Sequence, residues 1–206
     1  WTRAIERITR GSQGDFMKRF AVLGIAVVAV VGLFAQPALA ASPHLKGNNP
    51  IVFTDNGLTL TASVSYAGLG NFDTLQRLDA RGNPTSTCTN PAGATQPPGQ
   101  NPAEAAVSGS TAVPAGDIKN GNVTIGTVTD APVTPIPGAP DCPNPQWTEN
   151  ITDMAFTSAT IRLFQDSNAD GDFDDAGELV LTVNCTFTPP TSNGQVPRSG
   201  FTCVTA

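Results

Sequence analysis

Between residues 58 and 66 the chain alternates strictly between apolar and hydroxyl-bearing side chains. Thr or Ser fills every intervening position, and the apolar residues are Leu58, Leu60, Ala62, Val64 and Tyr66. Successive side chains of a β-strand point to opposite faces, so the pattern predicts a strand with one buried face. The glycine-containing segment 67–71 predicts a turn after it.

Eight further runs are short and β-prone, being rich in Thr, Val and Phe: 72–80, 85–89, 105–108, 123–128, 147–156, 159–165, 179–187 and 200–204. No stretch after residue 40 has a helical apolar period with a cap at each end. Proline-rich segments 90–102 and 134–145 are expected as surface loops, because proline cannot donate to a central ladder. The pattern predicts an all-β fold, an immunoglobulin-like antiparallel β-sandwich, with a small β-barrel as the alternative.

The N-terminal region has the parts of a secretory signal peptide. Met17-Lys18-Arg19 is basic, 20–34 is uncharged and apolar, and Ala38-Leu39-Ala40 is a small-residue cleavage site. The apolar run is short for a membrane-spanning helix, which needs about 20 residues. We therefore expect a signal peptide over 17–40, upstream read-through sequence over 1–16, and one secreted domain over 41–206.

The expected secreted part is acidic. Residues 41–206 hold six Lys and Arg against fifteen Asp and Glu, a formal charge of −9. Nucleic acids and anionic membrane surfaces are bound by clustered Lys and Arg. The total charge therefore argues against both as partners and leaves an extracellular ligand or protein of unknown kind.

Four cysteines follow the predicted cleavage site: Cys88, Cys142, Cys185 and Cys203. An even number of cysteines in an exported chain indicates disulfides, and four allow three pairings. The pairing Cys88–Cys142 with Cys185–Cys203 is favoured, because Cys185 and Cys203 lie in two neighbouring strand-like runs. No C-x-x-C spacing occurs and the chain has one histidine, which leaves little for a zinc site.

The most informative chemistry lies in the acidic segment 166–178, which has six carboxylates and no basic residue. Calcium prefers six to eight oxygen ligands, and a D-x-N-x-D-G pattern offers oxygens at alternate positions of a tight loop. The predicted ligands, with Asp172 contributing its carbonyl, are Asp166, Asn168, Asp170, Asp172, Asp174 and Glu178. Gly171 would permit the sharp turn.

The end of this segment departs from an EF-hand. Gly177 stands where the bidentate Glu is required, so Asp175 or Glu178 would have to supply the last ligand. The flanking runs are also strand-like rather than helical. The segment looks like the D-x-N-x-D-G calcium loops of extracellular bacterial β-domains, and the expected role of the ion is structural. The competing interpretation is a solvated acidic turn that holds no ion.

Catalysis has little support in the sequence. His44, the single histidine, follows the predicted cleavage site closely, and no G-x-S-x-G run occurs. A carboxylate pair of the glycosidase kind is not favoured by any spacing. A carbohydrate- or protein-binding module is the stronger alternative, in which Trp147, beside a proline-rich loop, stacks on a sugar. We expect a non-enzymatic protein.

Several short segments resemble a group of small, uncharacterised secreted β-rich proteins of actinobacterial type. They are Ser42-Pro43-His44, 67–71, Cys88-x-Asn90-Pro91, 98–101, 142–148 and 156–159. The resemblance spans roughly 42–165 and implies a β fold and a Cys88–Cys142 disulfide. It implies no activity, and it does not extend to the acidic segment.

Overall fold

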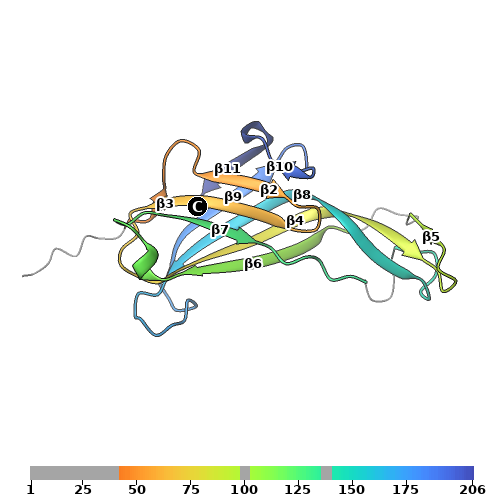
Figure 1. Ribbon diagram of the computed structural model, residues 1–206, viewed down its shortest axis with the longest axis horizontal. Coiled ribbons are helices and arrows are strands. Elements are labelled where there is room, and N and C mark those ends of the chain that lie inside the picture. Colours follow the sequence, from red (N-terminus) through yellow and green to blue (C-terminus); the bar gives the residue numbers. More distant parts are fainter. Residues whose placement is uncertain (1–41, 98–102, 136–140) are drawn as a thin grey trace, which may run out of the picture. The chain divides into compact units, whose positions relative to one another are not determined.

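Two antiparallel β-sheets pack face to face in the computed structural model, which describes residues 42–97, 103–135 and 141–206 (Figure 1). The strands do not close into a barrel. The predicted β-sandwich is therefore confirmed, and the barrel alternative is wrong. The predicted signal peptide over 17–40 and the upstream segment 1–16 lie outside the described residues, as do parts of both proline-rich loops.

The smaller sheet has five strands. Four of them follow the order β1-β3-β2-β10, and the fifth, β7, also pairs with β3. Its strands are β1 (His44–Leu45), β2 (Ile51–Asp55), β3 (Leu60–Ala67), β7 (Val123–Val128) and β10 (Gly194–Gln195). The alternation in the sequence positions β3 correctly, because Leu60, Ala62, Val64 and Tyr66 are all fully buried. This sheet covers one side of the core.

The larger sheet has six strands in the order β11-β9-β8-β4-β5, and β6 also pairs with β4. Its strands are β4 (Thr74–Thr89), β5 (Thr95–Gln96), β6 (Ala105–Val113), β8 (Thr148–Gln165), β9 (Leu179–Phe187) and β11 (Phe201–Thr205). β4 and β8 pair over nearly their whole length and run on together toward β5 (Figure 1). Both candidate sites described below lie on this sheet.

In two places, consecutive strands that the sequence predicts as separate form one long strand in the structure. The prediction divides β8 between residues 156 and 159, where the structure has a β-bulge: Arg81 pairs with Ser158 but Gly82 pairs with Phe156. An extra residue in one strand switches which alternate positions face inward. The buried positions of β8 accordingly change from Met154 and Phe156 to Ala159 and Ile161.

β4 also continues through the predicted break between residues 80 and 85. Pro84 lies where β4 is paired on one edge, beyond β6 and before β5. A proline without an N–H is tolerated at such an edge. The sequence analysis did not predict the two-residue strands β1, β5 and β10 or the five-residue strand β2.

The described helical content is two single turns of 3-10 helix, η1 (Ala115–Asp117) and η2 (Arg198–Gly200). Across the described ranges, no helix has the length and apolar character needed to span a membrane.

Aromatic rings join the two sheets at one end of the core. Phe53 of β2 makes edge-to-face contacts with Phe187 of β9 and Phe201 of β11, with ring centroids 5.0 Å apart in each case. Such pairs contribute about 0.5–1.5 kcal/mol beyond the burial of their area. Large-to-small changes at these rings would be costly.

A buried polar network joins the sheets elsewhere in the core. Tyr66 of β3 donates its hydroxyl to Gln76 Oε1 of β4 at 2.6 Å, and Gln76 Nε2 donates to Thr127 Oγ1 of β7 at 2.8 Å. Gln76 and Thr127 were not singled out by the sequence, because polar residues at inward positions interrupt an apolar pattern. The network satisfies polar groups that burial would otherwise penalise.

The two disulfides have the predicted pairing. Cys88 joins Cys142 across 54 residues, and Cys185 joins Cys203 across 18. Cys185 and Cys203 stand directly opposite each other on β9 and β11, as the neighbouring strand-like runs suggested. Two disulfides indicate that the fold forms in an oxidising environment.

Candidate functional site

The acidic segment forms the loop between β8 and β9, so its strand flanks are as predicted. Gln165 N–H donates to Glu178 O at 2.9 Å and closes the base of the loop. Asp166 N–H donates to Asp73 O at 3.0 Å, which attaches the start of the loop to the residue before β4. The loop is therefore fixed at both ends by the larger sheet.

The first predicted ligand, Asp166, organises the tight part of the loop. Asp166 is 5% exposed, and its carboxylate accepts the N–H groups of Asp170 at 3.2 Å and Gly171 at 2.9 Å. Gly171, where the sequence predicts a sharp turn, has φ +86°, a left-handed conformation that favours glycine. Ala169 also has a positive φ, +61°, which costs a side-chain-bearing residue about 1–2 kcal/mol.

The side chains of Asn168, Asp170 and Asp172 each accept a hydrogen bond from the backbone two residues further on. Asn168 Oδ1 accepts Asp170 N–H at 3.1 Å, and Asp170 Oδ1 accepts Asp172 N–H at 3.0 Å. Asp172 Oδ1 accepts Asp174 N–H at 2.7 Å. These repeated i to i+2 bonds curl the backbone into a succession of turns, which is the local reason that the segment is neither strand nor helix.

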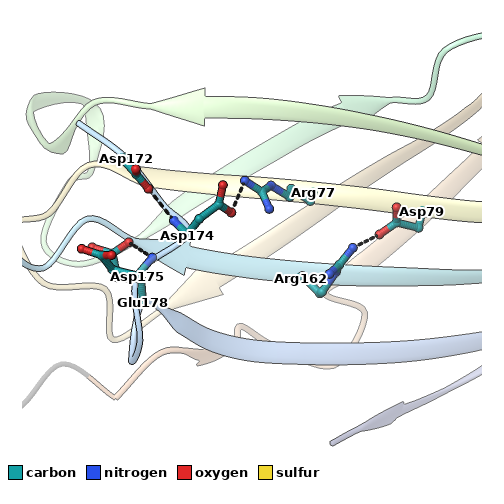
Figure 2. A network of polar contacts seen from close by, with 7 residues as sticks. All are labelled: Arg77, Asp79, Arg162, Asp172, Asp174, Asp175 and Glu178. Carbon is teal, nitrogen blue, oxygen red and sulfur yellow. Dashed lines mark hydrogen bonds and ion pairs between the residues drawn. The ribbon is translucent and has the colours of Figure 1, made fainter. Parts of the chain in front are cut away.

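Glu178 returns from the end of the loop to its beginning. Its side chain is 1% exposed, and its two oxygens accept Ser167 N–H at 3.2 Å and Asp175 N–H at 3.3 Å. Figure 2 shows Asp175 bonded to Glu178 in this way. The Asp175 carboxylate also accepts the Asn168 amide at 2.7 Å. Glu178 and Asp175, the two alternatives for the last ligand, therefore lie together.

Asp174 faces away from that pair toward β4. Its carboxylate is 2.8 Å from the guanidinium of Arg77 (Figure 2). The same guanidinium lies over the Phe164 ring, 4.7 Å from its centroid. Asp174 is 72% exposed on its side chain, so the ion pair is a surface one. Sequence analysis did not identify Arg77, because no local pattern relates an outward residue of β4 to a loop far along the chain.

The predicted ligands are thus linked by hydrogen bonds but are not gathered around one point. Among the described residues, no group of three or more His, Cys, Asp or Glu side chains has a metal-binding arrangement. Asp166, Asn168, Asp175 and Glu178 surround the base of the loop, whereas Asp172 and Asp174 bond along its other side. Coordination of a cation by Asp174 would require its side chain to turn away from Arg77.

The other sequence candidates lie apart from this loop. Trp147 is half-buried just before β8, and its backbone N–H donates to Asn144 O at 2.9 Å. His44 is exposed in β1, and its ring contacts Ser42 O at 2.7 Å. Neither residue has an acidic partner in the hydrogen bonds of the described chain.

Comparisons of the chain with protein family models, curated proteins and solved structures give no match. The resemblance to secreted actinobacterial-type proteins therefore stays a prediction.

Proposed function

We propose that the protein is a non-enzymatic extracellular β-sandwich whose β8–β9 loop binds a structural calcium ion. The observation that carries the proposal is the burial of two loop carboxylates, Asp166 and Glu178, with no basic residue in their hydrogen bonds. Burying an ionised carboxylate is costly unless it is paired or coordinates a metal. Backbone N–H groups offset part of that cost, and a cation would offset the charge itself.

The proposed role is structural because the loop belongs to a hairpin of the larger sheet. An ion there would hold Asp166 and Glu178, the two ends of the loop, against each other. Extracellular modules bind calcium with dissociation constants of about 10⁻⁴–10⁻³ M. A tenfold excess of calcium over such a constant stabilises the folded state by about 1.4 kcal/mol.

A thermal melt of the purified protein with millimolar calcium and then with excess chelator tests the proposal. For a domain of this size, about 1.4 kcal/mol corresponds to a rise of roughly 3–6 °C with calcium. Asp170→Ala should abolish the calcium-dependent difference. Asp117→Ala, which removes the same charge from the exposed turn η1, should preserve it. Identical melts with calcium and chelator would contradict the proposal and favour the interpretation of a solvated turn that holds no ion.

A change at Arg77 gives a second test, in which calcium binding should become tighter rather than be lost. Because Arg77 holds Asp174, Arg77→Gln frees a carboxylate and removes a nearby positive charge. A surface ion pair contributes about 0.2–1 kcal/mol, so calcium should bind up to about fivefold more tightly. Arg162→Gln is the matched control, since Arg162 pairs with Asp79 on the same sheet face rather than with the loop (Figure 2).

The alternative, a carbohydrate- or protein-binding module that uses Trp147 and the proline-rich loops, has less support. Stacking on a sugar needs an exposed flat ring, and Trp147 is half-buried.

A further inference from the structure

The outer face of the larger sheet has a polar groove over β4. Two adjoining hollows, of about 460 and about 420 Å³, share Asp79 and Ser108. Arg81, Ser158, Thr160 and Arg162 are among the residues that line the first, and Arg77, Ser110 and Asp130 line the second. The groove is separate from the Trp147 region and carries a different set of polar groups.

The groove follows from strand register. Arg77, Asp79 and Arg81 occupy alternate positions of β4, so all three point outward. Opposite Asp79 stand Ser108 of β6 and Thr160 of β8. The side chains of β6 on this face are small, which leaves the hollow between the longer side chains of β4 and β8. From Arg77 to Arg81 the groove runs about 13 Å along the strand.

Guanidinium groups concentrate here despite the acidity of the chain. Three of the six basic residues of 41–206 are Arg77, Arg81 and Arg162. Arg81 is 65% exposed on its side chain, and it forms a surface ion pair with Glu104 at 3.7 Å, which is too long for a hydrogen bond. Arg162 is 38% exposed and bonds Asp79 through one nitrogen at 2.6 Å (Figure 2). A guanidinium has five donors in a fixed fork that matches a carboxylate.

We propose that this groove binds a carboxylate-bearing oligosaccharide. Arg81 and Arg162, which line the same hollow, would share a sugar carboxylate. Ser108 and Ser158 offer hydroxyls that both donate to and accept from sugar hydroxyls, and Thr160, which donates to Asn184 Oδ1, can accept. Asp79 and Asp130 accept hydrogen bonds from sugar hydroxyls, so the mixture of acceptors and guanidinium groups suits a sugar chain that has both hydroxyls and a carboxylate. This inference does not rest on the proposed calcium site.

Isothermal titration with a pentamer of galacturonic acid, in excess chelator, tests the proposal. The chelator excludes an ion that bridges the sugar to the acidic loop, and circular dichroism under the same conditions establishes that each protein is folded. The acidic pentamer should bind at least about tenfold more tightly than a neutral galactose pentamer, since hydrogen bonds to charged groups are the stronger ones.

Two variants locate the binding. Arg81→Gln should weaken binding of the acidic pentamer about tenfold, and Ser108→Gln should weaken it by filling the junction of the two hollows. Lys46→Gln removes one charge from an exposed residue that lines neither hollow, and should leave binding unchanged. No binding, equal binding of the neutral pentamer, or an equal loss in all three variants would each overturn the proposal.

Discussion

Changing Tyr66 to phenylalanine removes one hydroxyl from the middle of the sandwich. That hydroxyl donates to Gln76 Oε1 at 2.6 Å, and Gln76, with 0% exposure, cannot obtain a replacement bond from solvent. Burial also raises the pKa of the Tyr66 phenol well above its usual value, so the hydroxyl stays protonated in any neutral assay. Its loss should therefore destabilise the fold at every pH in common use.

The expected magnitude follows from the unpaired acceptor. Leaving a buried polar group without its partner costs about 1–3 kcal/mol. A loss of about 2 kcal/mol lowers the melting temperature of a domain of this size by roughly 4–8 °C. In Tyr66→Phe/Gln76→Leu both partners become apolar, so the double variant should lose less than the sum of the two single changes.

Urea denaturation of the wild type, the two single variants and the double variant measures these free energies. Ser65→Ala is the matched control, because the Ser65 hydroxyl shares a 2.9 Å bond with Thr124 Oγ1 on the exposed face of the same strand. It should change stability by less than about 0.5 kcal/mol. A Tyr66→Phe change that is equally small, or strict additivity in the double variant, would refute the assignment of stability to the buried pair.

Three further changes have defined outcomes. Ala169→Gly relieves a positive φ and should raise the unfolding free energy by about 0.5–1 kcal/mol in the same denaturation assay. Removal of the Cys88–Cys142 disulfide should cost about 4 kcal/mol in oxidised protein, about 1 kcal/mol more than loss of the shorter disulfide. Burial raises the pKa of Asp55 in the folded protein above its usual 3.8. The stability that protonated Asp55 contributes is therefore fully present below pH 3.8 and is lost as pH rises through the folded-state pKa. Asp55→Asn should remove that fall from a pH series of melts.

Much of the fold could be predicted because its signals are local. A period of two, Gly and Pro between runs, and an even cysteine count are all properties of neighbouring residues. The prediction was wrong where a non-local feature intervened: the bulge opposite Arg81 and Gly82 reverses the alternation within β8. The predicted runs 72–80 and 85–89 are one strand, β4, and Pro84 is tolerated between them because one edge of the strand is unpaired there.

The acidic loop has a local sequence signal, whereas the groove does not. The loop consists of consecutive residues. Its turn at Gly171 and the contact of Glu178 with the start of the loop could be expected from the spacing of these residues. The groove is assembled from β4, β6 and β8, and only strand register brings Arg81 and Arg162 into one hollow. The total charge of −9 argued against partners that need clustered cations, yet alternation along β4 and β8 places three of the six basic residues on one face.

Arg77 belongs to both candidate sites, and this makes their ligands interdependent. It pairs with Asp174 of the loop and also lines the second hollow of the groove. Calcium that draws Asp174 into coordination would release the Arg77 guanidinium toward a sugar carboxylate. Coupling between two sites is reciprocal, so calcium should then strengthen binding of the acidic pentamer, and the pentamer should strengthen binding of calcium by the same factor. In Arg77→Gln the factor should fall to one; a factor that persists in this variant would show that the two sites communicate by another route.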